Sequence, residues 1–174
     1  MFTVPASNPH LKRTIRPLYA HHQATAWAGF LDPAYAGSPE IYPGTVMARI
    51  NVDGKGGEVF TPYTGATGQV PFGLSAFFVS SKAGVDEVTD SGSNTFTVWV
   101  GDGTALFEVL APAFDQEGGT WEVPADGSTV LLTGNDKGLL TTADATPQNA
   151  IAELIEVVGT SKITVRPFRP VPTA

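Results

Sequence analysis

Alternating hydrophobic and polar positions recur along much of the chain and predict β-strands. The clearest example is residues 94–101, where phenylalanine and valine side chains alternate with threonine and tryptophan. A strand is predicted over residues 71–81, which is apolar on both faces from Ala76 to Val79, as expected of a buried central strand. Further strands are predicted over residues 45–52, 58–63, 105–112, 118–124 and 128–134.

The pattern near the end of the chain fits two interpretations. Thr146 as an N-cap, Pro147 at the first helical position and Gly159 as a stop would define a short helix. A period of two over residues 150–158, followed by a turn and residues 162–168, instead predicts a pair of strands. We favour the strand pair.

Residues 1–40 are predicted to form an extended arm, and residues 41–174 a β-rich domain. Prolines at positions 9, 17, 33 and 39 interrupt any long helix in the arm. The arm is nevertheless too rich in aliphatic and aromatic side chains for a free disordered tail. It must therefore lie against its own body or a partner, and arms of this kind commonly become ordered on binding.

The composition also favours strands and turns. Among 174 residues there are 19 glycines and 14 prolines, and only 16% of residues are charged. We therefore predict an all-β fold, with a compact barrel-like or sandwich-like body, an extended N-terminal arm and little or no helix. There are no cysteines, which excludes disulfides and thiolate metal sites. The apolar runs are too short to cross a bilayer, so no membrane association is predicted.

Charge is distributed unevenly along the chain. All 17 acidic residues lie between Asp32 and Glu156, and six of the 10 basic residues lie outside that part. These six are Lys12, Arg13, Arg16, Lys162, Arg166 and Arg169. An acidic body argues against nucleic acid as a partner, because phosphate contacts need a basic stripe. The cationic ends either dock on an acidic protein surface or fold back onto the chain's own acidic body.

The sequence offers little catalytic chemistry. All three histidines, His10, His21 and His22, lie in the arm, so neither a metal site nor a Ser-His-Asp triad is predicted. Residues 101–104 (GDGT) lack the lysine and the helix of a phosphate loop and are interpreted as a turn, and residues 134–138 as a hairpin loop. We predict a non-enzymatic protein without cofactor or metal. A glycosidase-type carboxylate pair stays open, because its spacing is a tertiary property.

The tryptophans Trp27, Trp99 and Trp121 fit two uses. They could line a sugar-binding face, but aromatic side chains more often serve as core and interface anchors. Trp99 points away from the more apolar side of its predicted strand. We therefore place Trp99 at an oligomer interface.

The stretch "YPGTVMARI…FTPYTG…VPFGLSAFFV" resembles the head decoration (capsid cement) proteins of lambda-like tailed phages. In that family a Pro-Gly-Thr turn opens a strand, a Pro-Tyr pair follows a short hairpin, and a glycine with an apolar neighbour starts the next strand. The matching residues are Pro43, Gly44, Thr45, Val46, Pro62, Tyr63, Gly73 and Leu74.

This resemblance implies a non-enzymatic protein that binds the outside of the expanded head and stabilises it by bridging capsid subunits. It implies the major capsid protein as partner, homotrimers at local three-fold positions, and a place on the virion surface after assembly in the host cytoplasm. We expect the arm to contact the capsid through Leu11, Arg13, Ile15, Arg16 and Tyr19. The alternative is a carbohydrate-binding or adhesion module displayed on a virion or cell surface.

Overall fold

The computed structural model describes residues 14–20, 24–51, 58–77, 79 and 95–169. These residues form strands and loops without a helix, which confirms the predicted all-β fold. None of them belongs to a helix that could span a membrane. The strands are β1 (Ile15–Tyr19), β2 (Thr25–Leu31), β3 (Val46–Ile50), β4 (Val59–Pro62), β5 (Val70–Ser75), β6 (Thr95–Val100), β7 (Leu106–Leu110), β8 (Val130–Gly134), β9 (Leu140–Thr141), β10 (Ala152–Val158) and β11 (Lys162–Pro167).

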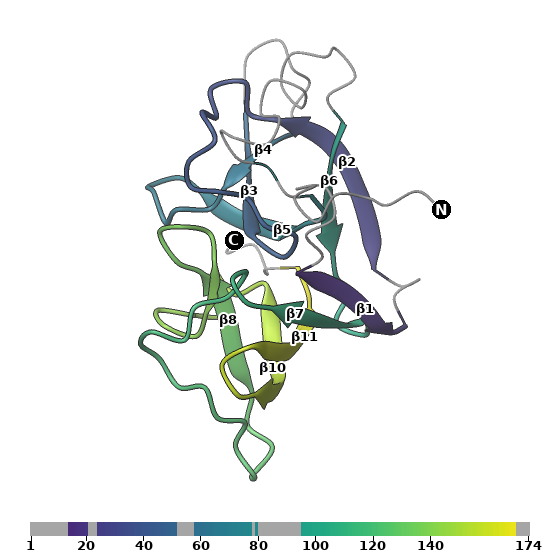
Figure 1. Cartoon of the computed structure of the whole chain (residues 1–174), viewed down its shortest axis with the longest axis vertical. Helices are drawn as coiled ribbons and strands as arrows, with labels where there is room; N and C mark the ends of the chain where they lie inside the picture. The colour runs from purple at the N-terminus through teal and green to yellow at the C-terminus, as the bar shows by residue number, and fades with distance from the viewer. Residues whose placement is uncertain (1–13, 21–23, 52–57, 78, 80–94, 170–174) are drawn as a thin grey trace, which may run out of the picture.

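The strands build a barrel stacked on a sheet (Figure 1). Strands β2-β4-β3-β5-β6 close the barrel, and the six-stranded sheet has the order β1-β7-β11-β10-β8-β9. Two stretches of chain cross between the sheet and the barrel, and their strands lie side by side in each part. β2 pairs antiparallel with β6 in the barrel, and β1 pairs antiparallel with β7 in the sheet. β1 and β2 thus run along β7 and β6, one pair in each part.

The described residues between 14 and 40 belong to these two parts. They supply β1 to the edge of the sheet and β2 to the wall of the barrel. β2 was not predicted, because its alanines and Gly29 weaken the strand pattern. Gly29 is needed there, since a Cβ at this position would lie 2.5 Å from the ring of Phe60. This stretch of the predicted arm therefore packs against its own body.

Two hydrophobic clusters form the core, and β3 contributes to both. Met47 belongs to the cluster inside the barrel, whereas Val46 and Ala48 belong to the cluster between barrel and sheet. Successive side chains of a strand point to opposite faces, so a strand that is apolar at every position can serve two cores. Full burial of each large aliphatic or aromatic side chain contributes roughly 1.5–3 kcal/mol.

The segment at the end of β11 ties the sheet to the barrel. A Cβ at Gly101 would lie 2.0 Å from the carbonyl oxygen of Pro167, so only glycine allows this crossing. The same oxygen accepts the N–H of Gly103 at 3.0 Å. Beyond it, the guanidinium of Arg169 lies 5.0 Å from the centre of the Trp27 ring on β2. The segment therefore acts as a strap across the junction of the two parts.

The predicted strand at 118–124 is wrong, and these residues form a loop. Gly118 and Gly119 both have positive φ, at 75° and 70°, which turns the chain away from a strand path. The apolar content that suggested a strand has another use, because Trp121 packs against Phe114 with ring centres 5.8 Å apart.

The strand predicted over residues 71–81 is confirmed only in its first part, because β5 ends at Ser75 and Phe77 is 43% exposed. The other predicted strands in the described ranges correspond to observed ones.

The end of the chain forms the strand pair rather than the helix. β10 and β11 pair antiparallel along their length, with a bulge after Leu154. The helix signals produce a single turn, in which Ala150 donates its N–H to the carbonyl of Thr146 at 2.9 Å. The hairpin predicted at residues 134–138 is also confirmed, since it joins β8 to β9.

Candidate functional site

Strand β1 presents an exposed apolar strip at the edge of the sheet. Leu18 and Tyr19 are 47% and 69% exposed, and the side chain of Arg16 is 62% exposed. Ile15 turns inward and packs against the core. β1 is the first strand in the sheet order, so no described strand pairs with its outer edge. An open edge beside apolar side chains can accept a further strand.

Several predicted site residues fall outside the part of the chain that the structure describes. These are Leu11, Arg13, His10, His21 and His22. Within the described ranges, no group of three or more His, Cys, Asp or Glu side chains could hold a metal ion. The described candidates for a capsid contact therefore all lie on β1.

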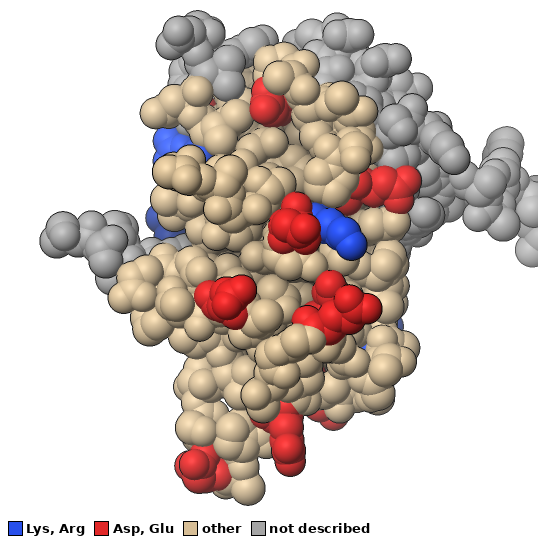
Figure 2. Space-filling model, turned by 90° about the vertical axis from the view of Figure 1, so that its left-hand side faces the viewer, with Lys and Arg blue, Asp and Glu red and all other residues tan. Residues whose placement is uncertain are grey.

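The loops between β7 and β10 carry an excess of acidic side chains. Residues 111–150 include one basic residue, Lys137, and six acids. The acids are Asp115, Glu117, Glu122, Asp126, Asp136 and Asp144. Among the described residues none of the six forms an ion pair with lysine or arginine. Figure 2 shows a face on which red acidic side chains outnumber blue basic ones.

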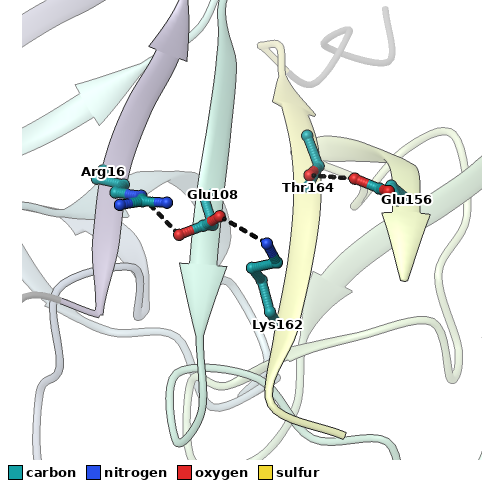
Figure 3. A network of polar contacts seen from close by, with 5 residues as sticks. All are labelled: Arg16, Glu108, Glu156, Lys162 and Thr164. Atoms are coloured by element: carbon teal, nitrogen blue, oxygen red, sulfur yellow. Dashed lines mark hydrogen bonds and ion pairs between the residues drawn. The ribbon is translucent and has the colours of Figure 1, made fainter. Parts of the chain in front are cut away.

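The outer face of the sheet, in contrast, is balanced in charge. Glu108 on β7 binds Arg16 Nε of β1 at 2.6 Å and Lys162 Nζ of β11 at 3.1 Å (Figure 3). One strand further, Arg166 NH1 lies 3.0 Å from Glu153 Oε2. Arg16, Lys162 and Arg166 therefore bind acidic residues of their own chain. This is the second of the two interpretations, in which the cationic ends fold back onto the acidic body.

Glu108 is a buried carboxylate with two cationic partners. Its side chain is only 5% exposed. Burial favours the neutral form, but the hydrogen bonds and charges of Arg16 and Lys162 outweigh it and hold the pKa of the Glu108 carboxyl below its ordinary value. Glu108 therefore stays ionised near neutral pH and attaches the edge strand β1 to the sheet.

The predicted turn at Pro43 and Gly44 is confirmed, and it packs beside β1. Thr45 donates its N–H to the carbonyl of Tyr42 at 2.8 Å, and Gly44 has a φ of 100°. The side chain of Thr45 accepts the N–H of Tyr42 at 2.8 Å. Thr14 Oγ1 donates to the carbonyl of Pro43 at 2.5 Å. The turn thus fixes the start of β1 against the entrance of β3.

The other two motif positions are not turns. Pro62 ends β4, and Tyr63 continues toward β3 by donating its N–H to a β3 carbonyl at 2.9 Å. The chain turns later, at Gly68, whose φ is 85° and where Gln69 N–H bonds back to a carbonyl at 3.0 Å. Gly73 lies within β5 rather than at its start, and a Cβ there would be 2.5 Å from a β6 carbonyl oxygen.

Trp99 lies between the barrel and the sheet. Its ring centre is 5.8 Å from that of Phe107 on β7, and it packs against the cluster shared by the two parts. Phe96, Val98 and Val100 on the same strand face into the barrel. The predicted orientation of Trp99 is therefore confirmed, and the contact seen is within the molecule. Its place at an oligomer interface stays a prediction.

A cleft of about 480 Å³ lies among the acidic loops. Asp136, Asp144, Asn135 and Asn149 are among the side chains that line it. The amides stabilise the loops themselves: Asn135 Nδ2 donates to Asp115 at 3.0 Å, and Asn149 Oδ1 accepts a backbone N–H at 2.7 Å. The arrangement of these groups serves loop structure.

Comparison with known proteins decides the family. A family model described as phage cement protein matches residues 1–174. The chain belongs to this family. No curated protein and no solved structure matches it. A phage cement protein is a structural component of the virion that stabilises the capsid, so the site to be sought on this cement protein is a docking surface.

Two features around the edge strand of this cement protein were missed in the sequence: the ion pairs of Glu108 and the exposure of Leu18. Glu108 was not singled out, although a lone acid in the apolar run of β7 is a signal that a sheet face needs a cation nearby, and Lys162 was named only as one of the cationic ends. Leu18 was also passed over. Its exposure follows from the bulge between Pro17 and Tyr19, which the sequence does not reveal.

Proposed function

We propose that this cement protein decorates the exterior of the expanded head of a lambda-like phage and stabilises it by bridging neighbouring capsid subunits. The observation that carries the proposal is the open edge of β1 with Leu18 and Tyr19 exposed beside it. A protein that docks on a capsid needs an exposed apolar surface whose burial is favourable, and this strip provides one.

The docking energy would come from two sources. A strand of the major capsid protein that pairs with the outer edge of β1 gains backbone hydrogen bonds. Leu18 and Tyr19 are 47% and 69% exposed, so burial of the rest of each side chain adds roughly 1–2 kcal/mol. A standard interface buries about 1,600 Å² in total, and a copy that contacts two subunits gains further from multivalency.

Other contacts in the fold hold β1 in position for docking. The Pro43-Gly44 turn, the strap at Pro167 and the Glu108 ion pairs hold β1 in a fixed position relative to the barrel. Rigidity lowers the entropic cost of docking. The acidic loops are poor candidates for the buried surface, because their six acids form no ion pair with a lysine or arginine of the described ranges, and we orient them toward solvent.

We further propose that the cement protein acts as a homotrimer at local three-fold positions of the shell and joins the head surface in the host cytoplasm. Three copies around an axis would place three β1 edges on the surrounding subunits. Light scattering of the free protein, and its stoichiometry on heads, test this arrangement.

The test of the docking surface is a variant carrying Leu18→Ser and Tyr19→Ser. Val70→Ser is the matched control, since Val70 is 57% exposed but lies on the barrel strand β5. We expect the double variant to lose at least about 30-fold in affinity for expanded heads in a sedimentation assay, and the control to bind as the parent protein. Parent-like binding by the double variant would contradict the proposed surface.

The carbohydrate-binding alternative finds no support in the tryptophans. The ring of Trp27 is stacked by Arg169, and its indole N–H donates to Glu58 Oε2 at 2.8 Å. Trp99 and Trp121 each pack against a phenylalanine of the body. These contacts use the aromatic faces that a sugar would need.

A further inference from the structure

Strand β1 is attached to the body along one edge only. It is the first described strand of the chain and pairs only with β7 among the described strands. Four of its five residues are exposed. Its ladder is also incomplete, because Pro17 has no N–H and the register shifts between Pro17 and Tyr19. Weakly buried edge elements of this kind open at low cost.

We propose that β1 is an exchangeable strand, and that in assemblies of this protein β7 of one copy receives β1 of a neighbouring copy. The exchange preserves every β1–β7 contact of the single chain, because both strands come from identical sequences. Exchange of an identical element is a low-cost route from monomer to oligomer.

The ion pairs of Glu108 suit such an exchange. When Arg16 departs with β1, Glu108 keeps Lys162, which reaches it from the other neighbouring strand, β11 (Figure 3). The opened sheet therefore does not leave a buried carboxylate without a cation, which would be costly. The incoming β1 restores the second ion pair, since its Arg16 again lies opposite Glu108.

The residue after β1 supplies a reason for the exchange. Ala20 has a φ of 49°, in the left-handed region that residues with a side chain avoid. This conformation is costly in the single chain. Exchange of β1 lets Ala20 leave it, and strained hinges of this kind favour strand exchange.

The partner is a second copy rather than another protein because the receiving edge is specific to β1. Arg16 must lie opposite Glu108, and Ile15 must enter the core beside the Pro43-Gly44 turn, where the Ile15 Cβ lies 3.7 Å from a Cβ built on Gly44. The exchange would lock the proposed oligomer together. It differs from capsid docking, which uses the outer edge of β1, so either proposal can fail without the other.

The absence of native cysteines allows a direct test. Tyr19 and Leu106 are opposite each other across β1 and β7, so Tyr19→Cys is prepared in one batch of full-length protein and Leu106→Cys in another. The two are mixed at high concentration, incubated and oxidised in solution, away from heads, because Tyr19 belongs to the proposed docking surface. Exchange predicts a disulfide-linked dimer that contains one copy of each variant, identified by mass after non-reducing electrophoresis.

The control pair is Glu153→Cys mixed with Arg166→Cys. These positions are also opposite each other, but on the hairpin strands β10 and β11, which no exchange separates. We expect no disulfide between molecules from this mixture. If the β1–β7 mixture gives no more linked dimer than the control, the proposal is overturned.

A further substitution tests whether Ala20 is the hinge of the exchange. Ala20→Gly, added to both members of the β1–β7 mixture, removes the strain of the closed form. We expect the linked fraction at equilibrium to fall about tenfold. An unchanged fraction would overturn the assignment of Ala20 as the hinge that drives exchange.

Discussion

Replacement of Gly101 by alanine tests the strap that holds the barrel to the sheet. The new Cβ would lie 2.0 Å from the Pro167 carbonyl oxygen, 2.3 Å from its carbonyl carbon and 2.6 Å from its Cβ. These neighbours are backbone or belong to a proline ring, so they cannot rotate away. The strap must move by about 1 Å or more, which strains the hydrogen bond from Gly103 to Pro167. We expect a loss near the upper end of the overpacking range, about 3 kcal/mol.

In a chain of this size, that loss lowers the Tm by roughly 6–12 °C in calorimetry. Gly159→Ala is the control, because Gly159 has a φ of 59° but open space around its Cβ position. It carries only the cost of a left-handed alanine, about 1–2 kcal/mol. A Gly101→Ala variant as stable as the parent, or no less stable than Gly159→Ala, would refute the steric argument.

Three further predictions concern the attachment of β1 and the junction. The pKa of Glu108 is lowered in the fold, so its contribution is present above the unfolded value of about 4.3 and is lost as pH falls through the folded pKa. The stability gap between the parent and Glu108→Gln should shrink from pH 7 to pH 3, and a constant gap in thermal unfolding would contradict this. Trp99→Ala should cost about 3 kcal/mol in urea unfolding, because Trp99 packs on Phe107, and a loss below about 1 kcal/mol would refute that packing. Thr14→Val should cost about 1–2 kcal/mol, since it removes the buried hydrogen bond to Pro43, and no change would exclude that bond as a support.

The pattern of apolar positions predicted the strands whose two faces are both buried. β3 and β6 alternate or run apolar because each is buried against the barrel interior and the sheet. The Pro43-Gly44 turn was also predictable, since only a glycine fits a φ of 100° there. Apolar strands and glycine turns depend on the properties of a few neighbouring residues, so they can be predicted from the sequence.

Other features depend on contacts between distant residues and were missed for that reason. β2 requires Gly29 because the Phe60 ring passes close by, and a glycine weakens any strand prediction. Glu108 binds cations from two strands that lie far from it in the sequence, so no spacing rule identifies it. Trp121 suggested a strand at 118–124 but anchors a loop instead.

Three of the residues expected from the sequence to contact the capsid, Ile15, Arg16 and Tyr19, lie on one edge strand, and their docking role stays a prediction. The sequence could not show that Arg16 is already paired or that Ile15 points inward. Both facts depend on the register between β1 and β7, which the sequence does not specify.

Hydrogen exchange on saturated heads is the most direct measurement of the proposed docking surface. Amide exchange rates are compared between free cement protein and protein bound to expanded heads. We predict slower exchange on heads for the backbone of residues 15–19, and unchanged rates for the loops of residues 115–129. Protection of the acidic loops with unaltered rates in β1 would contradict the proposal that this strand seats the protein on the shell.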